Sequence, residues 1–371
     1  MTETPTDRSA IDRGADRRPG PDRAGPDRTA REGSPGPGPG PGPSPRRALA
    51  ADLLDAFGPL APLLGSPEVT DVFVNGPGRA WVDRGFGATP DPAIRIGDEQ
   101  ALRALATRLV SFGGRHIDEA TPCVDVVVGP GIRVHAVLPP VSPTGTLLSI
   151  RLPAVTRLTL SDLDARGMFP PGVLDALATA VRERVNLLVT GAGGSGKTTL
   201  LSALLASAAA AERIVAVEDV SELRVAHPQF VALEARQSNL EGAGSIGLEQ
   251  LVREALRMRP DRLVLGECRG AEVRELLAAL NTGHDGGAGT LHANALDDVP
   301  TRMEALGALG GLSPEAVARQ AVSAIGLVVH LARRSGERRV VGLGRFTLDA
   351  RDRLGVAPLD SPVDPPVDRG S

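Results

Sequence analysis

Aromatic residues are scarce in this sequence of 371 residues: they make up 2% of it, and tyrosine is absent. Hydrophobic cores must therefore be built from Leu, Val, Ile and Ala, and aromatic platforms that stack nucleic-acid bases are nearly excluded. Only two cysteines occur, Cys123 and Cys268, and their spacing fits neither a disulfide framework nor a metal-binding motif. We interpret both as free thiols in a reducing compartment.

Long apolar segments are also missing. The sequence has no run of about 18 uncharged apolar residues, and its N-terminal segment is polar and charged where a signal peptide needs an apolar stretch. We therefore expect a cytoplasmic protein without a transmembrane segment. The net charge of -4 gives no global attraction to nucleic acid or to anionic membranes.

Lysine is nearly absent. Of the 41 Lys and Arg residues, all but Lys197 are arginines. Composition thus disfavours lysine strongly, and the single exception indicates a position where a compact ammonium group is needed rather than a planar guanidinium.

The two ends of the chain have the composition of disordered tails. Residues 1–47 contain no Val, Leu, Phe or Trp and are dense in Pro, Gly, Asp and Arg. Such a segment cannot bury enough apolar area to offset its ordering entropy, so we predict disorder for residues 1–47 and, on similar grounds, for 351–371. A partner-binding role for the first tail is an alternative.

Between the tails, the pattern predicts two α/β domains. In residues 48–152 a short helix near Leu53, strands in VTDVFVNG and RAWVDRG, a helix over about 99–112, and strands in CVDVVVG, IRVHAVLP and TLLSIRLP predict a mixed α/β domain. Residues 153–171 have weaker periodicity and are predicted to be a linker. In residues 172–350 strands and helices alternate, which is typical of a mostly parallel sheet covered on both faces.

A glycine-rich segment, GAGGSGKTT, matches the phosphate-binding loop pattern and lies between a predicted strand and a predicted helix. Its glycines let backbone N–H groups point at a phosphate, Lys197 reaches the β- and γ-phosphates, and Thr198 offers a hydroxyl ligand to Mg²⁺. The alternative is a glycine-rich turn without a ligand. The predicted nucleotide-binding positions are Gly191, Ala192, Gly193, Gly194, Ser195, Gly196, Lys197, Thr198 and Thr199.

Acidic residues follow two further predicted strands: Glu218 and Asp219 after IVAV, and Glu267 after LVLG. Parallel strands bring their carboxyl ends to the same crevice, so we expect these carboxylates near the phosphate loop. We assign Glu218 as the base for the attacking water and Glu267 as the holder of a magnesium-bound water, with Asp219 as a further candidate for the metal shell. The roles of Glu218 and Glu267 could be exchanged, and solvated loop acids are the alternative.

Two histidines flank a glycine-rich stretch in TGHDGGAGTLHAN. A zinc site of His284, Asp285 and His292 lacks a supporting thiolate or third imidazole. We favour His292 as a sensor of the γ-phosphate at a strand end, and a hydrogen-bonded structural histidine is the alternative.

Together, GAGGSGKTT, EDVSEL, LRMRPDRLVLGECRGAEVRELLAALNTGHDG and GTLHAN resemble the type II/type IV secretion ATPases, in particular the CpaF-type ATPases of tight-adherence (Flp) pilus assembly. The resemblance extends over about residues 67–331. It implies a homohexameric ring that binds ATP and Mg²⁺, in which each subunit joins an N-terminal domain to a RecA-like domain. It also implies a peripheral position at the inner membrane, on a platform protein of the pilus or secretion machine.

The resemblance further implies that arginines reach the nucleotide from the N-terminal domain or from a neighbouring subunit, and the matching positions are Arg133, Arg151 and Arg236. Such residues neutralise charge in the transition state. Plain surface arginines are the alternative. Two other functions remain open: a nucleic-acid-stimulated motor for DNA uptake or conjugation, which the scarcity of aromatics disfavours, and a scaffold that binds nucleotide without turnover.

Overall fold

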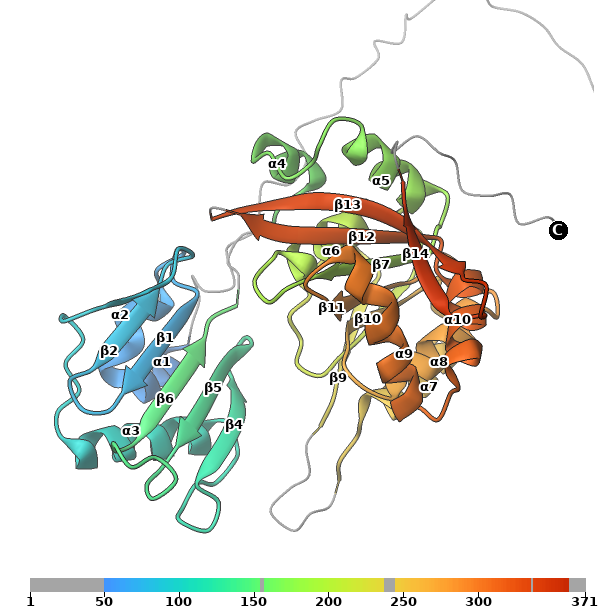
Figure 1. Cartoon of the computed structure of the whole chain (residues 1–371). Coiled ribbons are helices and arrows are strands. Elements are labelled where there is room, and N and C mark those ends of the chain that lie inside the picture. Colours follow the sequence, from blue (N-terminus) through green and yellow to red (C-terminus); the bar gives the residue numbers. More distant parts are fainter. Residues whose placement is uncertain (1–49, 154–156, 237–243, 335, 360–371) are drawn as a thin grey trace, which may run out of the picture. The chain divides into compact units, whose positions relative to one another are not determined.

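The structure is a computed structural model, which describes residues 50–153, 157–236, 244–334 and 336–359. The tail predicted at residues 1–47 lies outside the described residues. The described chain forms two sheets, each with its own hydrophobic core (Figure 1).

The first sheet is antiparallel and has the strand order β3-β2-β1-β6-β5-β4. Helices α1, α2 and α3 cover one of its faces (Figure 1). Helix α3 begins where the Asp98 side chain accepts a hydrogen bond from the Ala101 amide, and it buries Leu102, Leu105 and Leu109 at helical spacing. The elements are α1 (Ala51–Phe57), η1 (Gly58–Leu60), α2 (Ala61–Leu64), β1 (Asp71–Asn75), β2 (Ala80–Asp83), β3 (Ala88–Pro90), α3 (Glu99–Phe112), β4 (Cys123–Val128), β5 (Ile132–Val137) and β6 (Leu147–Arg151).

The second sheet has the order β14-β13-β12-β7-β11-β10-β8-β9, in which the strands from β12 to β9 run parallel and β13 and β14 are antiparallel additions at one edge. The elements are α4 (Leu160–Ala165), α5 (Val173–Arg182), β7 (Leu187–Gly191), α6 (Lys197–Ala206), β8 (Ile214–Glu218), β9 (Phe230–Glu234), α7 (Leu248–Arg257), β10 (Arg262–Cys268), α8 (Glu272–Leu280), β11 (Ala288–His292), η2 (Leu296–Asp298), α9 (Val299–Leu309), α10 (Pro314–Ala324), β12 (Leu327–Arg334), β13 (Glu337–Leu348) and β14 (Leu354–Pro358).

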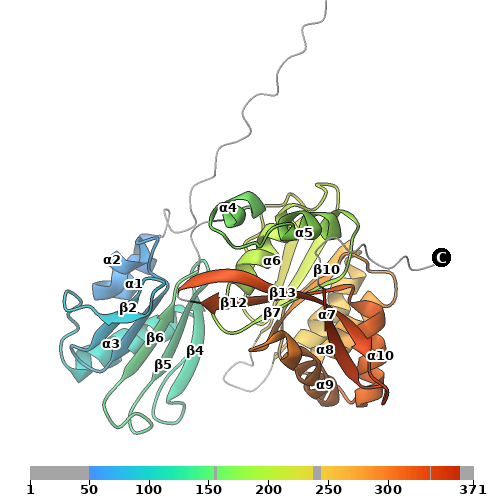
Figure 2. The same cartoon turned by 45° about the horizontal axis from the view of Figure 1, so that its top comes forward.

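Helices cover both faces of this second sheet (Figures 1 and 2). Helices α4, α5 and α6 pack on one face with Leu187 and Val189 of β7, whereas α7, α8, α9 and α10 pack on the other with Leu188. Alternate residues of a strand point to opposite faces, so a strand that is buried on both sides reads as a continuous apolar run. The predicted α/β fold with a mostly parallel, RecA-like sheet is confirmed.

The structure differs from the predicted boundaries of this part at both ends. Within the predicted linker 153–171, the Thr159 capping box starts helix α4, and Leu163, Met168 and Phe169 are buried in the core of the second sheet. Within the predicted tail 351–371, β14 pairs with β13 and buries Leu354. Short segments with few apolar residues carry little periodicity, yet a neighbouring strand or core can order them.

Candidate active site

The predicted phosphate loop joins the end of β7 to the start of α6. Every residue of β7 is buried, and the strand ends at Gly191, whose φ is 147°. A Cβ atom at Gly191 would lie 2.4 Å from the carbonyl oxygen of Leu331, so only glycine fits this close approach to β12. The first amide groups of α6 have no partner within the helix, and with the helix dipole they create an anion-binding end.

Lys197 is the first residue of α6, and its side chain folds back over the loop. Its Nζ atom donates hydrogen bonds to the carbonyl oxygens of Gly191 at 2.9 Å and Ala192 at 3.0 Å, and the residue is 9% exposed. Burial lowers the pKa of Lys197, while the carboxylates of Glu267 and Glu222 oppose that shift. The ammonium is therefore held at the mouth of the loop, near the carboxylates that end the neighbouring strands.

The loop also contains a buried hydroxyl group with unused bonding capacity. The Ser195 Oγ atom has no hydrogen-bond partner among the described residues, although Ser195 is fully buried. Buried polar groups are nearly always paired, so such an atom indicates a place where a ligand or water completes the bonding. Together with the ammonium and the free amides, this donor set fits the phosphates of a nucleotide, and Thr198 beside it fits as a hydroxyl ligand to Mg²⁺.

Glu218 ends β8 and is 3% exposed. Its Oε1 atom accepts hydrogen bonds from the backbone amides of Glu222 at 2.9 Å and Leu223 at 3.0 Å, whereas Oε2 is buried without a partner among the described residues. Burial raises the pKa of Glu218, and the two amide hydrogen bonds only partly offset that effect. One oxygen thus fixes the side chain while the other remains available, as a general base requires.

The close packing of Glu218 explains the glycine that precedes Glu267. A Cβ atom at Gly266 would lie 2.5 Å from the Cγ atom of Glu218, so any larger residue there would displace the buried carboxylate. The Thr290 hydroxyl of β11 donates to the carbonyl oxygen of Gly266 at 2.6 Å and holds this part of β10 in place.

Glu267 and Asp219 lie within reach of one arginine. The Arg269 guanidinium pairs with Glu267 at 2.5 Å and with Asp219 at 3.5 Å. The backbone amides of Arg269 and Gly270 donate to the Glu272 carboxylate at the start of α8, at 2.6 and 2.8 Å, and this fixes the loop that carries Arg269. Arg269 was not among the predicted site residues, although it follows Glu267 by two positions.

His292 ends β11 and is the neighbour of Gly191 in the parallel pairing with β7. Its ring lies beside the loop, because a Cβ atom at Gly193 would be 3.9 Å from the His292 Cε1 atom. His284 is turned elsewhere: its Nδ1 atom contacts the carbonyl oxygen of Ala279 at 3.2 Å. No group of three or more His, Cys, Asp or Glu side chains within the described part of the chain could hold a metal ion.

The three arginines implied by the resemblance lie on β5, on β6 and directly after β9. Arg133 and Arg151 are paired neighbours on β5 and β6 of the first sheet, and Arg151 bonds to Asp71 at 3.0 Å, which raises the pKa of the guanidinium. Arg236 follows β9, the edge strand farthest from the antiparallel addition, where its Nε atom donates to the carbonyl oxygen of Gly244 at 2.6 Å. The sheet order does not bring Arg236 next to the phosphate loop of its own chain.

A buried pair behind the loop also escaped the sequence analysis. The Thr190 hydroxyl and the Nδ1 atom of His330 are 2.8 Å apart, and both residues are buried where β7 and β12 pair. Burial lowers the pKa of His330. The sequence signal for this pair was a histidine in the middle of the apolar segment GLVVHLA. Its partner Thr190 directly precedes Gly191, where β7 enters the loop.

The fold and the loop together define a RecA-like protein with a phosphate-binding loop. A sequence model of the family described as "Type II/IV secretion system protein" matches residues 54–343, and the chain belongs to that family.

Curated relatives agree with this assignment. The chain is 50% identical over 301 residues to the "Putative conjugal transfer protein Rv3659c" of Mycobacterium tuberculosis, an alignment that covers 79% of this chain and 85% of the relative. It is 33% identical over 315 residues to the "Type IV secretion system protein PtlH homolog" of Bordetella bronchiseptica, with 76% and 92% covered. It is 31% identical over 267 residues to the "Type IV secretion system protein VirB11" of Brucella suis, with 64% and 73% covered.

Solved structures share the fold. The ATPase DotB of Yersinia pseudotuberculosis matches with a TM-score of 0.52 and 15% sequence identity, covering 84% of this chain and 79% of DotB. The pilus retraction motor PilT with bound ADP matches with a TM-score of 0.50 and 19% identity, covering 79% of this chain and 78% of PilT. In the described part of the chain, no helix is long and apolar enough to cross a membrane.

Proposed function

We propose that this protein is a magnesium-dependent ATPase that works as a ring-shaped motor of a type II/IV secretion or pilus-assembly machine. The observation that carries the proposal is the gathering of Lys197, Glu218, Glu267 and His292 at the carboxyl ends of β7, β8, β10 and β11. Glu218, Glu267 and His292 lie on strands of one parallel sheet, and Lys197 begins the helix that follows β7 of the same sheet. Open α/β sheets bind their ligands at these strand ends.

The residues of the loop bind the phosphates. The Lys197 ammonium exchanges its two carbonyl partners for phosphate oxygens, which are stronger acceptors because they carry charge. The amides at the start of α6 and the Ser195 hydroxyl complete the cradle. When bound, Mg²⁺ neutralises phosphate charge, and the Thr198 hydroxyl and a water held by Glu267 fit its preference for oxygen ligands.

Glu218 takes the proton from the attacking water. Burial raises the pKa of Glu218, so its carboxylate is a better proton acceptor than that of an exposed glutamate, and Oε1 is already fixed by two amides. His292, beside Gly193, is placed to sense the γ-phosphate. Arg269 holds Glu267 and Asp219 in a fixed orientation before the nucleotide arrives.

Arginines from outside the loop complete the site in a ring. Arg133 and Arg151 of the first sheet and Arg236 beyond β9 supply guanidinium groups to the nucleotide from the N-terminal domain or from the next subunit. An arginine brought in this way is worth about 10³ to 10⁵ in rate. The proposed assembly is a homohexamer.

The biological role that we propose is assembly of a tight-adherence pilus of the CpaF type, with the ring in the cytoplasm against a platform protein of the inner membrane. A second role, in conjugal transfer, is favoured by the similarity to the putative conjugal transfer protein of Mycobacterium tuberculosis. The two roles differ in an observable: a motor that acts directly on DNA is stimulated by DNA, whereas a motor that drives a protein platform is not.

The test of the ATPase proposal is Lys197→Ala. Loss of the ammonium removes the main charge opposite the terminal phosphates, so we expect ATP hydrolysis to fall by about 100-fold or more. Phosphate release is measured with and without Mg²⁺ and over a range of protein concentrations, since a ring gains specific activity as it assembles.

Two further variants accompany that measurement. Lys197→Arg retains the charge but not the compact shape, and it should also lose activity. Arg257→Ala removes an exposed arginine that pairs only with Glu254 among the described residues, and it should hydrolyse ATP like the unaltered protein. Unchanged turnover in Lys197→Ala would overturn the proposal, and stimulation by DNA would favour conjugal transfer over pilus assembly.

A further inference from the structure

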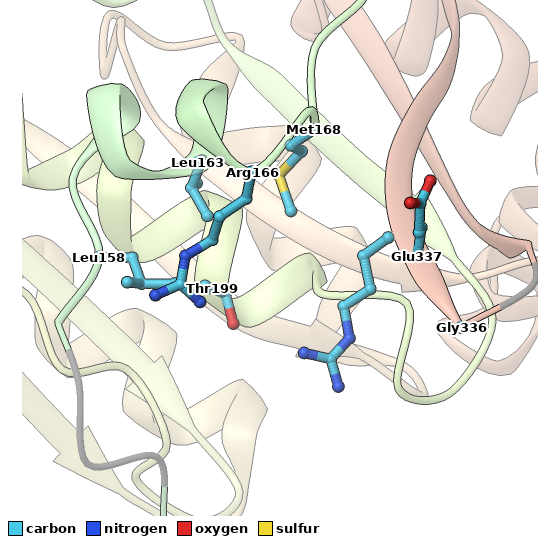
Figure 3. A pocket seen from close by; sticks show the side chains of 8 residues that line it. Leu158, Leu163, Arg166, Met168, Thr199, Gly336 and Glu337 are labelled. Carbon is cyan, nitrogen blue, oxygen red and sulfur yellow. The ribbon is translucent and has the colours of Figure 1, made fainter. Parts of the chain in front are cut away.

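A cavity of about 170 Å³ lies beside α6, within the unit built on the second sheet. Leu158, Leu163 and Met168 form its apolar side, and Arg166, Arg338 and the phosphate-loop residue Thr199 contribute polar groups. Figure 3 shows Leu163, Arg166 and Thr199 reaching toward the same space. An apolar wall with a few converging polar groups is the usual composition of a small-molecule site.

Arg338 connects this cavity to the phosphate loop. It is the second residue of β13, and its Nε atom donates a hydrogen bond to the carbonyl oxygen of Gly194 at 3.0 Å. Its side chain also lies against Gly196, where a Cβ atom would be 3.3 Å from the Arg338 Cδ atom. The guanidinium is therefore in contact with the loop on one side and with the cavity on the other.

None of the described carboxylates forms an ion pair with Arg338. Glu337 also lines the cavity, but it pairs with the neighbouring Arg339 at 2.9 Å. The Glu337 side chain points away from Arg166 and Thr199 (Figure 3). Desolvation lowers the pKa of Arg338 and the charge of Arg333 lowers it further, while the charge of Asp83 opposes this shift. Arg333 and Arg338 are register partners on β12 and β13, and two guanidinium groups on paired strands attract an anion.

The contacts along the phosphate loop indicate which part of a bound nucleotide would lie next to the cavity. Lys197 and Thr198 serve the β- and γ-phosphates and the metal ion, and the loop amides hold the α- and β-phosphates. Arg338 contacts the loop at Gly194 and Gly196, among these amides, and it lines the cavity together with Thr199. The cavity therefore adjoins the part of the loop that holds the α-phosphate, to which the nucleoside is attached.

We propose that Arg338 is a nucleotide-binding residue that contacts the α-phosphate, while the cavity with Leu158, Leu163, Met168 and Arg166 takes the nucleoside. This inference rests on the proposed function, because it assumes that the loop binds a nucleotide. The α-phosphate does not react, so the contact is equally strong in the ground state and in the transition state. Arg338 then sets affinity rather than the rate of the chemical step.

The test is Arg338→Gln, which removes the charge and keeps a donor of similar reach. Calorimetry with MgADP should show affinity about tenfold or more weaker, as expected for a lost charge-assisted hydrogen bond. In steady-state kinetics KM for ATP should rise by a similar factor while kcat changes by less than about twofold. Arg338→Lys should recover part of the affinity, and Arg339→Gln, the matched control on the same strand, should bind MgADP normally.

Three outcomes would overturn the inference. If Arg338→Gln binds MgADP as tightly as the unaltered protein does, Arg338 does not contact the nucleotide. An equal loss in Arg339→Gln would mean that only the general charge of the hairpin matters. A fall in kcat that matches the fall in kcat/KM would mean that Arg338 acts by holding the loop through Gly194 rather than by binding nucleotide. If the unaltered protein itself fails to bind MgADP, it is the proposed function that fails.

Discussion

Buried polar groups are fully paired at one end of strand β10 and unpaired beside its other end. At its first residue, Arg262 is 3% exposed and its donors are paired with the Glu212 carboxylate and with the carbonyl oxygens of Val181 and Gly286. At the other end, the Glu218 Oε2 atom on the adjacent strand is buried without a partner among the described residues. A fully paired buried group serves the fold, whereas an unpaired one is retained at a cost in stability and indicates a site.

The largest expected effect concerns the unpaired end. Glu218→Gln keeps the Oε1 acceptor for the amides of Glu222 and Leu223 but can no longer accept a proton. We expect kcat for ATP hydrolysis to fall by about 10² to 10⁴ with little change in nucleotide affinity. Glu234→Gln is the control, since Glu234 is the exposed register partner of Glu218 on β9. If kcat of Glu218→Gln stays within a few-fold of the original value, the base is Glu267 and not Glu218.

The same variant should be more stable than the unaltered protein, and the gain should depend on pH. Because the folded-state pKa of Glu218 is raised, its buried charge costs stability at neutral pH, and this cost disappears as pH falls through that pKa. The difference in unfolding free energy between Glu218→Gln and the unaltered protein should therefore be largest near pH 7. It should shrink as pH falls to about 4. Denaturant titrations at several pH values measure it, and a pH-independent difference would contradict the assignment.

The next effect concerns the paired end. Among the described residues, Arg262→Ala leaves the Glu212 carboxylate, which is 14% exposed, with only Arg184 at 3.6 Å. It also removes the side-chain donor of the Gly286 carbonyl, whereas the Val181 carbonyl still accepts from the Arg184 amide. Breaking such a buried pair costs about 3–5 kcal/mol of unfolding free energy. Arg257→Ala, which breaks an exposed pair, should cost less than about 1 kcal/mol. Similar losses in both variants, measured by urea denaturation, would remove the distinction between the two ends.

The smallest effect tests packing rather than pairing. Gly266→Ala adds a methyl group 2.5 Å from the Glu218 Cγ atom, so the carboxylate must move. We expect a loss of about 1–3 kcal/mol in stability together with reduced kcat. Gly247→Ala is the control, because a Cβ atom there meets no atom within 4 Å. Full activity in Gly266→Ala would show that the site tolerates a displaced Glu218.

Much of the second sheet could be predicted from the sequence, because strands buried on both faces are continuous apolar runs and their helices have a clear apolar side. What was missed lies at the edges. β9, β13 and β14 are partly exposed, and β13 mixes arginines and glycines with its apolar residues, so their patterns are weak. Helix α5 is different: VLDALATAVR has strong helical periodicity and could have been found.

The candidate site was predictable where residue type carries information. A lone lysine after a glycine is a strong signal, and acids after apolar strands are a moderate one. The identity of an arginine carries almost no information here, since every Lys or Arg residue but one is an arginine. Arg269 and Arg338 therefore became visible only through their distances to Glu267 and Gly194. Spacing along the chain cannot reveal which strand edge a hairpin such as β12–β13 places beside a loop.

The solitary lysine has a practical consequence for chemical modification. Reagents that acylate lysine side chains have a single target in this sequence, Lys197, which is 9% exposed. Mass analysis after acylation would thus report occupancy of the phosphate loop, because bound nucleotide protects this side chain. The same chemistry is a poor choice for cross-linking the subunits of the proposed ring, and the exposed thiol of Cys123 is a better attachment point for that purpose.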